Sequence, residues 1–176
     1  MTLFRLVKEL AYREGTFMLS SGKISDFYFD AKKVLLAQAG ARLFAEWLLD
    51  RIAEVDPRPV AIGGLEIGAI PIAAVTMALS PFPLRTFVVR KQPKGHGTAG
   101  QIEGDVGPGD PVVVVDDVIT TGESTMKAIR ALEEQGCRVV AIYSLVDRNE
   151  GHTPEFEARK ALFRPAFTID QFRGPA

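Results

Sequence analysis

Cysteine and histidine are both scarce in this sequence. Its 176 residues include one cysteine and two histidines. One thiol has no partner in the chain, so a disulfide-stapled secreted scaffold is excluded. The histidines, His96 and His152, lie far apart, and we therefore do not expect a histidine-rich zinc site. Cys137 follows Gly136 at the start of an apolar run, which favours a core residue over a reactive thiol.

An excess of either charge is also missing. The chain has 21 basic and 22 acidic residues, and its formal net charge is -1. A balanced chain has no global field that would draw it to nucleic acid or to an anionic membrane. We therefore expect neither partner, and any anionic ligand must be held by local cations.

Long apolar runs are absent except for one segment that needs a membrane check. Residues 67–84 carry no charge over about the length of a bilayer span. Three prolines, Thr76 and Ser80 interrupt this segment, so we predict a buried loop and helix, with a membrane span as the alternative. Residues 1–15 contain several charges and no apolar signal-peptide core, so we expect a cytoplasmic protein.

The residues that are present predict one α/β domain. A chain of this length with 47% hydrophobic residues fits a single domain with an ordinary core. Helical spacing is found at residues 4–11, 41–52, 70–79 and 123–135, an aromatic strand is expected at 25–33, and apolar strands at 60–62, 86–89, 112–115 and 139–146. Alternating strands and helices indicate a mostly parallel sheet flanked by helices.

The most informative segment is residues 112–124, VVVVDDVITTGES. An apolar strand leads into Asp116 and Asp117, and a turn of small residues then opens a helix. Ligands of α/β sheets bind at the carboxyl ends of the strands, and a helix N-terminus attracts anions. We expect a phosphate there, with turn-capping acids as the alternative. The glycines around Gly68 are explained by a tight strand-to-helix turn.

This segment resembles the phosphoribosyl diphosphate (PRPP) motif of the type I phosphoribosyltransferases. The resemblance implies a domain of that fold over residues 1–176, with a small N-terminal base-binding hood at residues 1–36 and a flexible catalytic loop at residues 91–110. It assigns the two acids to the ribose hydroxyls and the turn to the 5′-phosphate. The PRPP-binding residues that it implies are Arg90, Lys91, Lys94, His96, Asp116, Asp117, Val118, Ile119, Thr120, Thr121, Gly122, Glu123 and Ser124.

Charge is segregated around the predicted loop. Residues 85–102 contain four cations and no acid, whereas residues 103–126 contain six acids and no cation. Residues 92–111 have no predicted structure, and a stretch of that length is usually a lid or a disordered segment. The string RKQPKGHGT resembles the catalytic loop of orotate phosphoribosyltransferases, although a solvated basic loop is the alternative. The resemblance implies a homodimer in which Arg90, Lys91, Lys94 and His96 reach the pyrophosphate in the partner's site.

Two further segments favour orotate as the base. FMLSSGKISDFYFDAK, residues 17–32, resembles the family's aromatic orotate segment, which places Tyr28 and Phe29 at the ring. Core packing is the alternative for these aromatics. Arg148 follows an apolar strand, and a guanidinium is the best partner for the carboxylate that distinguishes orotate from uracil. A surface arginine is the alternative there. Thr120 completes the implied orotate site.

These resemblances predict an orotate phosphoribosyltransferase of pyrimidine biosynthesis, which forms orotidine 5′-monophosphate and pyrophosphate. Asp116, Asp117, Lys94 and His96 are the expected catalytic residues, and His96 could protonate the leaving pyrophosphate. We expect Mg²⁺ to arrive with PRPP rather than to be permanently bound. A purine or xanthine phosphoribosyltransferase and a non-catalytic PRPP-binding regulator are the alternatives.

The chain departs from the family pattern at two positions. Ser20 stands where many members carry a lysine and Gly68 where some carry another, which leaves fewer cations near the diphosphate. The tail after Glu150 has no assigned function.

Overall fold

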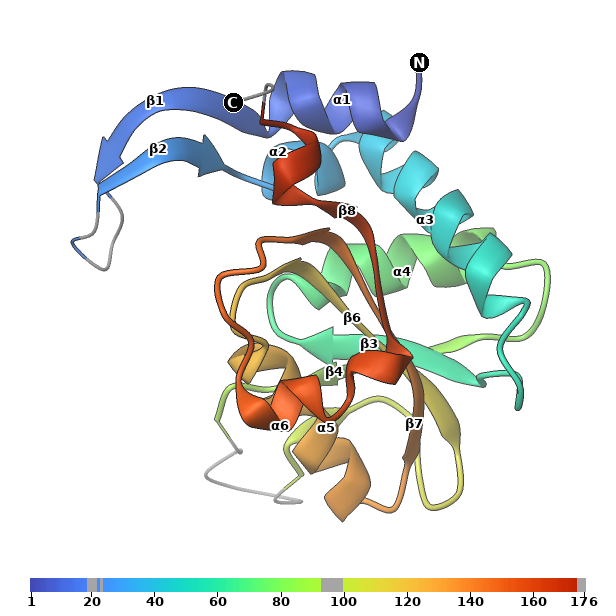
Figure 1. Cartoon of the computed structure of the whole chain (residues 1–176). Coiled ribbons are helices and arrows are strands. Elements are labelled where there is room, and N and C mark those ends of the chain that lie inside the picture. Colours follow the sequence, from blue (N-terminus) through green and yellow to red (C-terminus); the bar gives the residue numbers. More distant parts are fainter. Residues whose placement is uncertain (19–21, 23, 93–99, 174–176) are drawn as a thin grey trace.

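The computed structural model describes all residues except 19–21, 23, 93–99 and 174–176, and it contains two sheets (Figure 1). The strands are β1 (Tyr12–Met18), β2 (Ile24–Phe29), β3 (Ala61–Leu65), β4 (Arg85–Val89), β5 (Ile102–Glu103), β6 (Pro111–Ile119), β7 (Arg138–Asp147) and β8 (Phe163–Thr168). The helices are α1 (Leu3–Leu10), α2 (Lys32–Leu35), α3 (Gln38–Ile52), α4 (Ala69–Leu79), α5 (Glu123–Glu134) and α6 (Pro154–Glu157), with short 3₁₀ turns η1 (Lys160–Leu162) and η2 (Ile169–Gln171).

The larger sheet has six strands in the order β5-β4-β3-β6-β7-β8. All its neighbouring strands are parallel except β5, which pairs antiparallel with β4. Strand β6 is flanked by strands on both sides, so the residues at its carboxyl end reach the middle of the sheet edge. This mostly parallel α/β arrangement confirms the predicted fold class.

Helices cover both faces of the sheet, and the alternation along β6 shows which helix covers which face. Val113 and Val115 pack in one core with α3 and α4, whereas Val112 and Val114 pack in another core with α5. Figure 1 shows α3 and α4 on the same side of the sheet, with α5 on the other. Because both faces of β6 are covered, successive residues of the strand are apolar, which explains the continuous apolar run from which it was predicted.

The four apolar runs are found as β3, β4, β6 and β7, and the predicted helices are found as α1, α3, α4 and α5. The uncharged segment 67–84 forms a turn, helix α4 and a second turn. Within the described part of the chain, no helix is long and apolar enough to cross a membrane.

Two regions contain more structure than the sequence indicated. The stretch 92–111 was expected to lack secondary structure, but it contains β5, whose Glu103 and Ile102 pair with Val88 and Val89 of β4. The tail after Glu150 forms α6 and the edge strand β8, which pairs with β7. Both strands were missed because neither presents an apolar run.

Residues 1–36, the segment predicted as a hood and called the hood below, carry the antiparallel pair β1–β2, and Phe172 near the end of the described chain packs into their core. Figure 1 shows the segment after β8 returning to lie beside α1 and α2. Phe172 is fully buried, and its ring centroid lies 5.0 Å from that of Phe4 and 6.0 Å from that of Phe29. Arg173 forms an ion pair with Asp26 of β2. The hood is therefore built from both ends of the described chain.

Candidate active site

Asp116 lies at the carboxyl end of β6 and is only 9% exposed. One of its oxygens accepts the backbone N–H of Asp117 at 2.9 Å, and the other accepts the hydroxyl of Thr125 on α5 at 3.3 Å. Burial, together with the negative charge of Asp117, raises the pKa of Asp116 to about 7. A buried carboxyl beside a second acid is an arrangement that functional sites often contain.

Asp117 makes a long-range contact with the end of the hood. Its Oδ1 accepts the backbone N–H of Val118 at 2.9 Å, and its Oδ2 lies 3.0 Å from the ammonium of Lys32 on α2. The hydrogen bond from Lys32 to Asp117 raises the pKa of that lysine. Lys32 had no predicted role, because no sequence spacing connects it to an acid 85 residues away.

The turn between β3 and α4 packs directly against the acid pair. A Cβ atom on Gly68 would lie 2.6 Å from Oδ1 of Asp117 and 3.0 Å from Oδ1 of Asp116. A side chain at this position therefore requires both carboxylates to move. Glu66 in the same turn accepts the backbone N–H of Lys91 at 2.8 Å, which ties the turn to the start of the predicted loop.

These groups surround a cavity of about 280 Å³. It combines two cations, the acid pair and the glycine turn, and its lining residues are Lys32, Leu65, Glu66, Ile67, Gly68, Lys91, Asp116, Asp117, Val118 and Ser124. A smaller hollow of about 40 Å³ adjoins it, lined by Asp116 and residues 118–125. Seven of the thirteen residues predicted to bind PRPP line this smaller hollow in addition to Asp116: Val118, Ile119, Thr120, Thr121, Gly122, Glu123 and Ser124.

Residues 120–124, here called the phosphate turn, line part of the smaller hollow. Gly122 adopts a φ of 80°, in the left-handed region that favours glycine, and a Cβ atom there would overlap the ring of Phe156. Helix α5 begins at Glu123, so its free N–H groups face the turn. Backbone donors at a helix N-terminus suit a phosphate group.

Arg148 lies between the phosphate turn and the hood. Its backbone N–H donates to the carbonyl of Ile119 at 2.8 Å, and its guanidinium carbon is 5.0 Å from the ring centre of Phe27. The side chain pairs with Glu150 at 2.5 Å. Its Nε is buried and has no hydrogen-bond partner among the described residues, so this donor is unsatisfied there.

The two aromatic residues predicted to contact orotate occupy different faces of β2. Phe29 is buried in the hood core against Phe172, whereas Tyr28 is 40% exposed and lies 5.6 Å from the ring of Phe17. Tyr28 is therefore the residue of this pair that presents an exposed ring. Phe27, which had no assigned role, is the aromatic neighbour of Arg148.

The predicted loop is described only in part. Arg90 pairs with Glu103 at 3.3 Å, and its Nε is buried without a hydrogen-bond partner among the described residues. Lys91 lines the cavity of the acid pair. Lys94 and His96 lie outside the described residues, as does Ser20.

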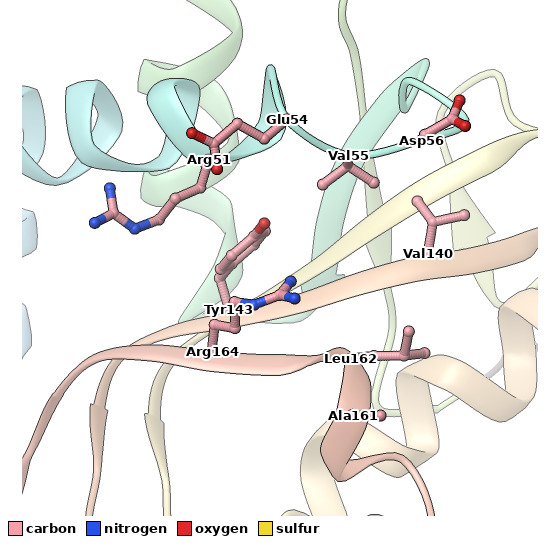
Figure 2. Close-up of a pocket in the computed structure, with 9 residues that line it drawn as sticks. All are labelled: Arg51, Glu54, Val55, Asp56, Val140, Tyr143, Ala161, Leu162 and Arg164. Carbon is pink, nitrogen blue, oxygen red and sulfur yellow. The ribbon is translucent and has the colours of Figure 1, made fainter.

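A second cavity, of about 330 Å³, lies away from the acid pair (Figure 2). It is formed where the end of α3 approaches β7 and β8, and Tyr143 and Arg164 are among its lining residues. Its charged residues have both signs, and none of the predicted site residues lines it. Its larger volume alone therefore does not identify it as the functional site.

Known proteins share this fold and sequence. The family model of the phosphoribosyl transferase domain matches residues 30–171. The orotate phosphoribosyltransferase of Aquifex aeolicus is 41% identical over 161 residues, which cover 88% of this chain and 87% of that protein. This chain belongs to the orotate phosphoribosyltransferase family. The family consists of glycosyltransferase-type enzymes. The membership of this chain in the family confirms the resemblance found in the sequence.

Solved structures of the family agree with the fold. A crystal structure of the Mycobacterium tuberculosis orotate phosphoribosyltransferase has 34% sequence identity and a TM-score of 0.85, and the match covers 97% of this chain and 96% of that one. Another structure of the same M. tuberculosis enzyme, in complex with PRPP, matches with 30% identity and a TM-score of 0.81 over 97% and 96% of the two chains.

Proposed function

We propose that this protein transfers the 5-phosphoribosyl group of PRPP to N1 of orotate, giving orotidine 5′-monophosphate and pyrophosphate. The observation that carries the choice of base is Arg148. Its guanidinium lies beside Phe27 of the hood, its backbone is bonded to Ile119 next to the phosphate turn, and its buried Nε is unused. A planar cation in this place suits the carboxylate of orotate, which uracil and the purines lack.

The acid pair and the phosphate turn form the proposed PRPP site. Asp116 and Asp117 would accept the ribose hydroxyls, while the turn would bind the 5′-phosphate through its N–H groups and hydroxyls. Lys91 lines the same cavity and would meet the diphosphate. The related M. tuberculosis enzyme forms a complex with PRPP, which supports this assignment.

Mg²⁺ fits the donors of this cavity. Asp116 and Asp117 supply carboxylate oxygens, and Mg²⁺ prefers oxygen ligands and usually binds together with phosphates. When bound, the ion would neutralise negative charge on the diphosphate. The protein groups would orient the sugar so that the bond from C1′ to pyrophosphate breaks as the bond from C1′ to N1 of orotate forms.

We also propose a homodimer in which the loop 91–110 covers the partner's active site. Helix α4 begins directly after the Gly68 turn and leaves apolar side chains exposed at helical spacing, namely Ile70, Ala74 and Met77. Residues at i, i+4 and i+7 form one face of a helix, and an apolar face of this kind favours burial against a second copy. The face begins at Ile70, directly after the Gly68 turn that lines the cavity, so a partner bound there would lie beside the proposed active site.

A panel of bases tests the reaction. The protein is incubated with PRPP and Mg²⁺ and with orotate, uracil, adenine or xanthine, and pyrophosphate release is followed. We expect turnover with orotate alone, and uracil is the matched control because it lacks only the carboxylate. Equal turnover of uracil, or a preference for a purine, contradicts the proposal. PRPP binding without turnover of any base would instead support a regulator.

A further inference from the structure

The segment between β7 and α6, residues 148–153, packs beside the phosphate turn. The backbone N–H of Arg148 donates to the carbonyl of Ile119 at 2.8 Å, and that of Thr153 donates to the carbonyl of Thr121 at 2.9 Å. Two backbone hydrogen bonds therefore attach residues 148–153 to the end of β6 and to the turn. Any displacement of this segment therefore moves Arg148, the residue proposed to bind the base, relative to the phosphate turn.

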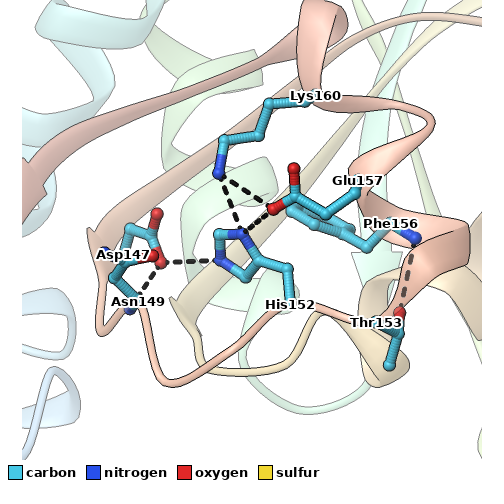
Figure 3. A network of polar contacts seen from close by, with 7 residues as sticks. All are labelled: Asp147, Asn149, His152, Thr153, Phe156, Glu157 and Lys160. Carbon is cyan, nitrogen blue, oxygen red and sulfur yellow. Dashed lines mark hydrogen bonds and ion pairs between the residues drawn. The ribbon is translucent and has the colours of Figure 1, made fainter.

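His152 bridges the two ends of this segment (Figure 3). Its side chain is fully buried, with Nε2 at 3.0 Å from a carboxylate oxygen of Asp147 and Nδ1 at 2.9 Å from one of Glu157. Lys160 lies 2.9 Å from Nδ1 and 3.2 Å from the same oxygen of Glu157. One imidazole thus connects the last residue of β7 to α6, and both of its nitrogens have partners.

The Asp147 end of the bridge controls the backbone on both sides of Arg148. Asp147 is buried, and the oxygen that faces His152 also accepts the backbone N–H of Asn149 at 2.8 Å. Asn149 has a φ of 48°, so the chain turns sharply directly after the arginine. A buried carboxylate needs hydrogen-bond donors, and His152 supplies the side-chain donor to Asp147.

We propose that His152 is a positioning residue for base recognition, which acts through Asp147 and Glu157 to hold the turn that aims Arg148. It does not itself contact the base. This inference rests on the proposed function for its kinetic consequence, but the bridge itself is testable without catalysis.

The first test measures amide hydrogen exchange in the ligand-free protein. His152→Phe keeps an aromatic ring at the position that packs 4.9 Å from Phe156 and 6.1 Å from Phe163, but it removes the polar contacts with Asp147, Glu157 and Lys160. We expect faster exchange at the amides of Arg148 and Thr153, while the amides of β6 keep their protection. Unchanged exchange at both amides would overturn the proposal.

The second test separates positioning from stability. In His152→Phe we expect the KM for orotate to rise about tenfold, because Arg148 would be misplaced. The KM for PRPP should stay within about threefold of the wild-type value. A lower melting temperature with an unchanged KM for orotate would assign His152 a merely structural role and would overturn the proposal.

Arg159→Gln is the matched control. Arg159 follows α6 and pairs with Glu133 of α5 at 2.9 Å, so it also ties this region to a neighbouring helix but does not touch His152. We expect neither faster exchange at Arg148 nor a change in the KM for orotate. If Arg159→Gln reproduces the effects of His152→Phe, the bridge has no specific role.

Two further outcomes are covered by the design. If the wild-type protein does not use orotate, the proposed function fails, while the exchange data still decide whether His152 holds the segment. If His152→Phe does not fold, Glu157→Ala replaces it, because Glu157 is half exposed and its loss leaves no buried charge at that end. Faster exchange at Thr153 then supports the bridge, and unchanged exchange overturns it.

Discussion

Arg148 combines partial burial, an aromatic neighbour and a donor without a partner. The contact with Phe27 and the pairing with Glu150 keep the guanidinium extended beside the hood, so it has little freedom to lose when a ligand binds. A preorganised cation of this kind binds a planar carboxylate more strongly than a flexible surface lysine does.

Arg148→Ala is expected to weaken orotate binding by about 2–4 kcal/mol, because a partly desolvated, charge-assisted pair is lost. PRPP affinity should stay nearly intact, because the side chain of Arg148 is not among the groups lining the cavity of the acid pair. Titration calorimetry with each ligand measures both effects. Arg164→Ala, which alters the second cavity, is the control. A fall in PRPP affinity for Arg148→Ala would show that the arginine is misassigned.

Asp116 makes protein stability depend on pH. Its pKa is raised to about 7 by burial and by Asp117, whereas an aspartate in an unfolded chain titrates near about 4. Between these values the folded state holds a proton that the unfolded state releases. The free energy of unfolding contributed by this group therefore falls as the pH rises through the window.

The variant Asp116→Asn should not lose this part of the free energy of unfolding at high pH, because an amide does not ionise. At pH 8 we expect the free energy of unfolding of the variant to exceed that of the wild type by about 2 kcal/mol, which raises the melting temperature by about 4–8 °C. Both differences should shrink toward pH 5. Thermal melts at several pH values measure the effect. Parallel curves for the two proteins would contradict the pKa assignment. Turnover should fall sharply in the same variant, because the ribose would lose a carboxylate.

At the scale of elements, the parts recognised from sequence are those with a strong local pattern. Strand β6 begins with a run of valines buried on both faces and ends with the acid pair, and the phosphate turn follows it, all within the thirteen consecutive residues 112–124. The strands that were missed are atypical. Strand β5 has two residues, and β8 contains Pro165, which an edge strand tolerates although it breaks the apolar pattern.

Site residues from distant segments were harder to predict for a physical reason. Lys32 meets Asp117 because the hood lies next to the sheet edge, and Phe29 packs against Phe172, which returns to the hood from a distant part of the chain. Such contacts depend on tertiary packing, which local periodicity does not encode. The roles of Lys94 and His96 stay predictions from the family resemblance.

Gly122→Ala is expected to damage the phosphate turn as an element. The left-handed φ disfavours any Cβ atom, and the fully buried ring of Phe156 occupies the place where it would lie. We expect a loss of about 2–4 kcal/mol in stability and a weaker affinity for PRPP. Chemical unfolding and PRPP titration measure these two effects. Gly109→Ala is the control, because it has a similar φ of 84° but open space around it.

At the scale of the whole molecule, the proposed dimer makes a quantitative prediction. Lys94→Ala and Asp117→Asn should each be inactive alone, since one removes a loop cation and the other removes an acid. If the loop acts across the interface, a mixed dimer has one site with both defects and one intact site. Random pairing makes half of the dimers mixed, so activity should return to about a quarter of the wild-type value.

Subunit exchange must be verified separately in that experiment, for example by mass spectrometry of differently labelled chains. Exchange without recovered activity would place the loop over its own subunit's site. A protein that stays monomeric at assay concentrations yet turns over orotate would contradict the dimer as well.

The burial of Phe172 in the hood has a consequence for protein synthesis. The rings of Phe4 and Tyr12 lie 5.0 and 6.2 Å from that of Phe172, so two early residues of the hood pack against a residue that is synthesised much later. During translation the sheet strands β3 to β7 emerge long before residue 172, and domains generally begin to fold as they emerge. The hood is therefore the last region to acquire its core. A chain that lacks residue 172 would therefore leave the hood without one of its fully buried aromatic side chains.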